Sequence, residues 1–169
     1  LLELIMGPTC SIIYENEPME KNTMVQKPRP FTTTFFNFRE LITSIIQGLV
    51  ITLGALSTYQ YAVAQGFNED VTRTMVFMVL IFSNILLTLV NRSFYYSIFT
   101  TLKYRNRLVP LIIGITLVLS ALLLFAPPFT AFFEFETLTA EQLGICFFAG
   151  LVSVLWYEVV KWRKRFRTK

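Results

Sequence analysis

The chain opens on an apolar run that passes abruptly into a polar, proline-rich segment, and residues 1–30 read LLELIMGPTCSIIYENEPMEKNTMVQKPRP. The apolar part, residues 1–14, is shorter than the roughly 20 residues that a membrane-spanning helix needs. Gly7 and Pro8 inside it are expected to break or kink a helix. A re-entrant or interfacial segment is one interpretation. We favour the second half of a kinked spanning helix that begins upstream of Leu1.

Residues 15–40 are predicted to form a cytoplasmic loop that ends at the membrane interface. Prolines at positions 18, 28 and 30 exclude a regular helix, and charged side chains surround them. Toward the end of this stretch, Phe35, Phe36 and Phe38 stand among polar residues. Such a mixture is typical of the lipid headgroup region.

Four apolar stretches follow, each long enough to cross a bilayer: residues 41–64, 71–91, 109–126 and 143–162. Hydrophobic residues make up 54% of the chain and charged residues 15%, against about 25% charged in soluble domains. The sequence therefore predicts an all-α membrane protein, a bundle of four complete transmembrane helices preceded by a partial helix broken at Gly7 and Pro8. All of residues 1–169 would form a single transmembrane domain. Residues 129–142 are expected to be a loop, in which Thr139 and Gln142 have the spacing of a capping box.

The basic residues are distributed so unevenly that they predict the orientation in the membrane. Of the 15 Lys and Arg, Arg73 alone falls on the side of the membrane opposite to the others. The rest fall in residues 21–39, in residues 92–107, and in the basic tail, residues 163–169, with the helix end before it. Because basic loops stay on the cytoplasmic side, these segments and the C-terminus are expected to be cytoplasmic. The net charge of +4 is therefore ascribed to a membrane surface and not to a nucleic-acid partner.

Small residues form a stripe along the first complete span, which would allow another helix to approach closely in lipid. They are Gly48, Gly54, Ala55 and Ser57. The two cysteines, Cys10 and Cys146, stand far apart in apolar runs. They are too few for a disulfide framework or a zinc site, and we interpret both as buried small hydrophobes.

Several motifs, taken in order along the chain, resemble those of one membrane-protein family. They are Gly7-Pro8, Glu17-Pro18, Met24 with Pro28-Arg29 four residues later, Asn91-Arg92-Ser93, and Glu158-Val159-Val160-Lys161 before the basic tail. In this order they resemble the C-terminal transmembrane domain of P-type cation-transporting ATPases. The first three would belong to the sixth helix and the cytoplasmic loop after it. The last two would belong to the eighth and the tenth helix.

The resemblance implies the membrane-embedded part of an ATP-driven cation translocase, expected in the plasma membrane. Its last four helices would support the upstream ion-transporting helices within the lipid bilayer. The loop that starts at Glu15 would touch the cytoplasmic phosphorylation domain of the same parent chain. ATP and Mg would be bound by that parent. No cofactor is expected in residues 1–169, which contain neither the Asp-Lys-Thr-Gly phosphorylation motif nor a GxxxxGK phosphate loop.

The same resemblance points to positions at which a transported cation would bind. In calcium and sodium/potassium pumps the broken sixth helix supplies an Asn and a Thr-Asp pair before the Gly. Those positions hold Leu2, Ile5 and Met6 here, and none of these offers an oxygen ligand to a hard cation. The nearest carboxylate is Glu3, and the eighth-helix ligand of these pumps aligns with Asn84. These departures count against calcium specificity and leave a proton or a monovalent ion, with Glu3 as the titrating group.

Glu3 and Asn84 are thus the ion-binding candidates, and each also has a structural interpretation. A carboxylate at membrane depth is a functional candidate by default, although Glu3 would equally serve as a protonated or hydrogen-bonded structural acid. For Asn84 we favour a hydrogen bond to a neighbouring helix over cation coordination. Glu158 is interpreted as the helix partner of Lys161. No residue is assigned as a certain metal ligand.

A second hypothesis is a stand-alone four-helix membrane module for assembly or lipid interaction, without an ATPase partner. The four complete spans favour it. The start of the chain in the middle of a helix, and the cost of exposing Glu3 to lipid, count against it. An internal-repeat transporter is discounted, because residues 41–91 and 109–162 share only their apolar character.

Overall fold

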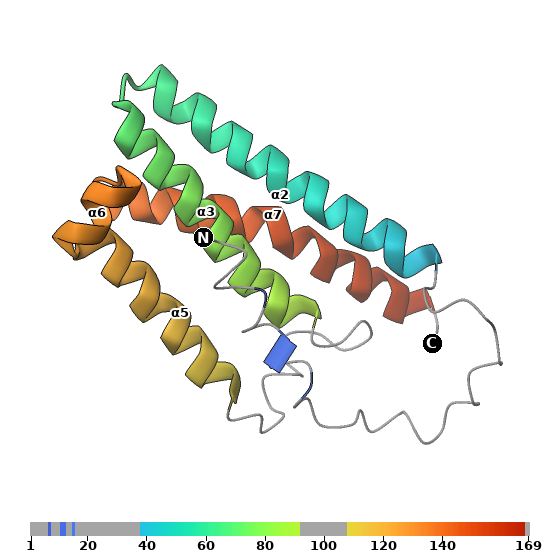
Figure 1. Cartoon of the computed structure of the whole chain (residues 1–169). Helices are drawn as coiled ribbons and strands as arrows, with labels where there is room; N and C mark the ends of the chain where they lie inside the picture. The colour runs from blue at the N-terminus through green and yellow to red at the C-terminus, as the bar shows by residue number, and fades with distance from the viewer. Residues whose placement is uncertain (1–6, 8–10, 13–14, 16–37, 92–107, 168–169) are drawn as a thin grey trace.

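The computed structural model describes residues 7, 11, 12, 15, 38–91 and 108–167, except for the side chains of residues 39, 40, 108, 112 and 164–167. From residue 38 onward the described residues form five helices and no strand (Figure 1). The helices are α2 (Phe38–Ala64), α3 (Glu69–Asn91), α5 (Leu108–Phe125), α6 (Pro127–Phe133) and α7 (Ala140–Arg167). The predicted all-α class is confirmed.

Three of these helices, α2, α3 and α7, are long and apolar enough to cross a membrane. A fourth span is present if α5 and α6 are counted together as one broken span. The expected spans at residues 41–64, 71–91 and 143–162 coincide with α2, α3 and α7. The expected span at residues 109–126 coincides with α5, which counts as a span only together with α6. Each of these four helices begins one to three residues earlier than expected. Helix α7 also continues to Arg167, so that it includes most of the predicted basic tail.

The chain turns by 80° between α5 and α6. Ala126 has an extended backbone (φ −88°, ψ 117°), the conformation that a residue before proline prefers. Pro127 and Pro128 then occupy the first turn of α6, where their missing N–H groups leave no helical bond unmade. The prediction of a loop over residues 129–142 is therefore wrong at its start, because the proline pair that ends one helix also begins the next.

A tight turn joins α2 and α3 into an antiparallel hairpin. Gly66 has a positive φ of 74°, and its N–H donates to the carbonyl of Val63 at 3.0 Å. The N–H of Phe67 donates to the carbonyl of Ala62 at 3.1 Å. This pair of bonds is the Schellman ending of a helix, which favours glycine at the left-handed position. Asn68 then accepts a backbone hydrogen bond through its side-chain oxygen and caps the start of α3.

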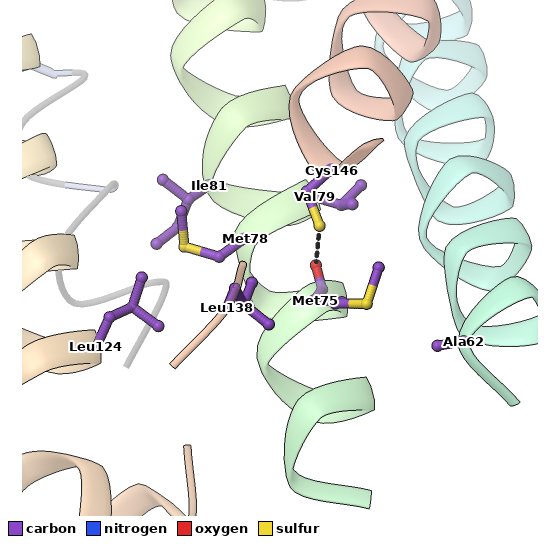
Figure 2. Close-up of a cluster of buried hydrophobic side chains, with 8 residues drawn as sticks. All are labelled: Ala62, Met75, Met78, Val79, Ile81, Leu124, Leu138 and Cys146. Atoms are coloured by element: carbon purple, nitrogen blue, oxygen red, sulfur yellow. Dashed lines mark hydrogen bonds between the residues drawn. The ribbon is translucent and has the colours of Figure 1, made fainter. Parts of the chain in front are cut away.

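The α2–α3 hairpin packs on α7, and each of the three helices contacts the other two. Figure 1 shows α5 set apart from this three-helix bundle, beside α3. The main core lies in the half of the bundle next to the α2–α3 turn (Figure 2). Its buried members are Ala62, Met75, Met78, Val79, Ile81, Leu124, Leu138 and Cys146. Leu124 is the contribution of α5 to this core.

Cys146 is fully buried in this core, and its thiol donates to the backbone carbonyl of Met75 across the α3–α7 interface at 3.4 Å (Figure 2). The interpretation of Cys146 as a buried small hydrophobe is confirmed, whereas Cys10 lies outside the described residues. A second core, formed by Ile51, Val90, Val154 and Tyr157, occupies the other half of the bundle.

Helix α7 begins with the capping box that the sequence predicted. The N–H of Thr139 donates to Oε1 of Gln142 at 2.8 Å, and the N–H of Gln142 donates to Oγ1 of Thr139 at 3.3 Å. The segment before this cap contacts α3: Arg73 pairs with Glu134. This ion pair joins the α6–α7 connection to the start of α3.

Candidate functional site

Most of the residues that the sequence analysis singled out lie outside the described residues: Glu3, Pro8, Met24, Pro28 and Arg29. Gly7 is described as helical and exposed, and a Cβ built on it meets no described atom within 4 Å. Asn84 lies in α3 and is half-buried. The ion-binding roles of Glu3 and Asn84 therefore stay predictions.

Asn84 forms its side-chain hydrogen bond inside its own helix. Nδ2 donates to the carbonyl oxygen of Leu80, one turn earlier, at 2.8 Å. We expected Asn84 to hydrogen-bond a neighbouring helix, and the structure shows a bond within α3 instead. A short amide side chain reaches the carbonyl four residues earlier in its own helix. The neighbouring residue, Ser83, is fully buried, and within the described part of the chain its hydroxyl has no hydrogen-bond partner.

Near the middle of the bundle, α7 approaches both partner helices so closely that only small residues fit. A Cβ built on Gly54 of α2 would lie 2.1 Å from Oγ and 3.3 Å from Cβ of Ser153. A Cβ built on Gly150 of α7 would lie 3.1 Å from the backbone nitrogen of Ser83 in α3. Gly54 thus has the packing role predicted for the small-residue stripe. Gly48, in the same stripe, is exposed and meets no described atom within 4 Å.

At the end of the bundle away from the α2–α3 turn, two amide side chains join α2 to α3. Gln47 Nε2 donates to Asn91 Oδ1 at 3.0 Å, and Asn91 Nδ2 donates back to Gln47 Oε1 at 3.2 Å. Gln47 is only 3% exposed, which places this reciprocal pair inside the bundle. The pair satisfies one donor and one acceptor on each residue, which lowers the cost of placing the two amides within the bundle.

At the same end a buried lysine joins α7 to α3. Lys161 is 2% exposed; its Nζ donates to the carbonyl oxygen of Val90 and to Glu158 Oε1, the latter at 3.0 Å. The ammonium also lies 5.4 Å from the ring centroid of Tyr157. The carbonyl of Val90 is one of the last of α3 and has no partner within that helix, so a cation there is favourable. We call Lys161, Glu158 and the Val90 carbonyl the lysine clamp.

The predicted pairing of Glu158 with Lys161 is confirmed. The sequence analysis missed the second contact of Lys161, its hydrogen bond to the carbonyl of Val90 in α3. The lysine was counted with the basic residues at the end of the last span, whereas the structure buries it between helices. The available signal was weak: Lys161 lies three residues after Glu158 on a mostly apolar helix, a spacing that also occurs on exposed surfaces. Gln47 and Asn91 were likewise separated by too many residues to suggest a pair.

The contacts described above join α2, α3 and α7 to one another. Within residues 38–91 and 108–163, no cluster of three or more His, Cys, Asp or Glu side chains could hold a metal ion. The sequence profile described as "Cation transporting ATPase, C-terminus" matches residues 1–163. The chain belongs to the cation-transporting ATPase C-terminal family. The resemblance noted in the sequence motifs is thereby confirmed.

The chain is also similar to "Calcium-transporting ATPase 1" of Schizosaccharomyces pombe (strain 972 / ATCC 24843). The two are 25% identical over 150 residues, which cover 88% of this chain and 17% of the relative. The chain therefore corresponds in length to a small part of that relative. As a C-terminal domain of the cation ATPase family with several apolar helices, it is an integral, multi-pass membrane part of a cation pump.

Proposed function

We propose that this domain is the static support of an ATP-driven P-type pump, against which the ion-carrying helices upstream move. The observation that carries the proposal is that the α2–α3–α7 bundle is held at three levels. The lysine clamp and the Gln47–Asn91 pair hold one end. The contact of Gly54 with Ser153 holds the middle, and the Arg73–Glu134 pair ties the other end to the α6–α7 connection. Buried polar contacts and close glycine packing oppose sliding of one helix against another.

In this proposal the parent chain supplies the chemistry. ATP and Mg would bind upstream, and residues 15–40 would contact the phosphorylation domain on the cytoplasmic side. The basic connections and the C-terminus would face the cytoplasm, and the plasma membrane is the proposed compartment. The name of the relative, a calcium-transporting ATPase, makes calcium one candidate cargo. Leu2, Ile5 and Met6 offer no oxygen ligand to a hard cation, which counts against calcium, and a proton or a monovalent ion is the other candidate cargo.

A disulfide between α2 and α7 tests the static role. The Cβ built on Gly54 lies 3.3 Å from Cβ of Ser153, close to the separation of about 3.5–4.5 Å found in disulfides. We expect a full-length pump carrying Gly54→Cys and Ser153→Cys to form this bond on mild oxidation. ATP-driven cation uptake into vesicles should then be the same before and after reduction.

The variant with Ser153→Cys alone, oxidised in the same way, is the control for the lost hydroxyl. Loss of uptake on oxidation, with recovery on reduction, would mean that α2 and α7 shift during transport. That result would contradict the static support while leaving the pump assignment intact.

The proposed ion-binding role of Glu3 has its own test in the full-length pump. Glu3→Gln keeps the shape of the side chain and removes its titration. We expect ion-stimulated ATP hydrolysis to be abolished or its ion dependence to be altered, because an ionisable group at membrane depth is retained mainly for function. Asn84→Leu is the companion variant. An ion dependence of Glu3→Gln equal to that of the parent would end the role proposed for Glu3.

A further inference from the structure

A cavity of about 610 Å³ lies between α2 and α3 beside their connecting turn. Its lining comes from both helices and the turn: Tyr59, Val63, Phe67, Glu69, Thr72, Arg73 and Val76. Tyr59 and Val63 are about half exposed, so the cavity opens on the surface of the hairpin. The lining is therefore a mixture of aromatic, aliphatic and charged side chains on an exposed face.

The polarity of the lining changes along the helix axis. Glu69 and Arg73 lie in the first turns of α3, next to the turn of the hairpin, and Val76 lies farther along. Seven residues separate Glu69 from Val76, about 10 Å at 1.5 Å per residue. That length matches one headgroup layer and the first carbons of the hydrocarbon layer in a membrane. The charged part of the cavity would thus lie among headgroups, and the apolar part would contact glycerol and acyl carbons.

The two charged residues offer opposite charges to one ligand. The contacts of the Arg73 guanidinium with Glu134 and Asp70 all use Nη1, which leaves Nη2 and Nε to donate to an anion. Glu69 is exposed, and within the described part of the chain its carboxylate has no ion-pair partner. A phosphate suits the guanidinium, and a primary ammonium suits the carboxylate.

The surroundings of the cavity disfavour an anionic lipid. Among the described residues at this end, the first turns of α3 and α7 and the α6–α7 connection carry acidic side chains around the single Arg73: Glu69, Asp70, Glu134, Glu136 and Glu141. This excess of negative charge repels a headgroup with a net negative charge. A zwitterionic headgroup has no net charge and can place each of its charges beside the opposite one.

We propose that this cavity binds the phosphoethanolamine headgroup of a membrane phospholipid. Arg73 holds the phosphate, Glu69 accepts hydrogen bonds from the ammonium, and Tyr59, Val63 and Val76 contact the glycerol and the upper acyl chains. The site lies at the membrane-interface end of the hairpin, away from the lysine clamp. It does not depend on the static role proposed above.

Native mass spectrometry of the full-length protein tests the site. The protein is taken from nanodiscs with equal fractions of phosphatidylethanolamine, phosphatidylcholine and phosphatidylglycerol, and the retained lipids are counted. We expect phosphatidylethanolamine to be retained above the other two lipids. Glu69→Gln should lower that preference about tenfold, the effect of losing one charge-assisted hydrogen bond.

A steric variant separates the cavity from the rest of the lipid-facing surface. Val63→Trp should fill the cavity and remove the retained phosphatidylethanolamine. Val152→Trp on α7 is the matched control, because Val63 and Val152 are 54% and 53% exposed. Equal retention of the three lipids by the parent protein would overturn the proposal. Unchanged lipid retention by Val63→Trp would also overturn it. That holds even if the variant is less stable, because a loss of stability without a loss of lipid would mean that another protein segment, and not a lipid, fills the cavity.

Discussion

Lys161→Met is expected to destabilise the bundle by about 3–5 kcal/mol, the cost of removing one member of a buried ion pair. The loss leaves the carboxylate of Glu158, whose side chain is 15% exposed, without its cation. It also leaves the carbonyl of Val90, near the end of α3, without its side-chain donor. Reversible unfolding of the purified domain in mixed micelles, followed by tryptophan fluorescence, measures the free energy of unfolding.

The double variant Lys161→Met with Glu158→Leu is the matched control. Replacing both members of a buried pair by apolar residues of similar volume is often neutral, so we expect it to regain more than half of the loss. The outcome separates a buried clamp from an ordinary basic residue at the membrane surface. A cost below about 1 kcal/mol for Lys161→Met, the value for exposed pairs, would show that the ammonium is solvated.

Gly54→Leu is expected to weaken the α2–α7 interface by about 1–3 kcal/mol or more, as is usual for overpacking. The first atom of the new side chain would already lie 2.1 Å from Oγ of Ser153. That hydroxyl cannot simply rotate away without losing its bond of 2.7 Å to the carbonyl of Ala149, and Cβ of Ser153 is itself only 3.3 Å away. The helices must therefore separate, and the melting temperature of the full-length protein should fall.

Gly48→Leu is the control for this second prediction, because Gly48 is in the same helix and a Cβ there meets no described atom within 4 Å. Leucine is a better helix former than glycine, so we expect this variant to be neutral or more stable by about 0.5–1 kcal/mol. Equal losses of stability at positions 48 and 54 would mean that glycine matters for flexibility and not for close approach.

The static-support proposal also predicts how each variant should affect transport. If the bundle is a static support, breaking the lysine clamp or the Gly54–Ser153 contact should lower the amount of folded pump. The ion dependence of the molecules that remain folded should not change. Glu3→Gln should do the reverse. Measuring uptake per folded molecule keeps the two classes of residue apart.

The sequence by itself determined the class of protein and the position of its spans. Long apolar runs are expected to form helices in a bilayer, because a helix makes all of its backbone hydrogen bonds within one segment. That rule placed the spans at residues 41–64, 71–91, 109–126 and 143–162 to within a few residues of the helix starts. The capping box of Thr139 and Gln142 was also readable, since its bonds join residues three apart. The ordered motifs were enough to suggest the family.

Only the tertiary structure decided which polar residues face the interior of the bundle. Lys161 lies 71 residues from Val90 and Gln47 lies 44 residues from Asn91, so no local pattern relates them. In the same way, Gly48 and Gly54 look alike in the sequence, and only the path of α7 brings a neighbouring helix close to Gly54. A membrane helix can expose apolar side chains on every face, so hydrophobic periodicity does not reveal which face meets protein. That choice arises when the helices pack.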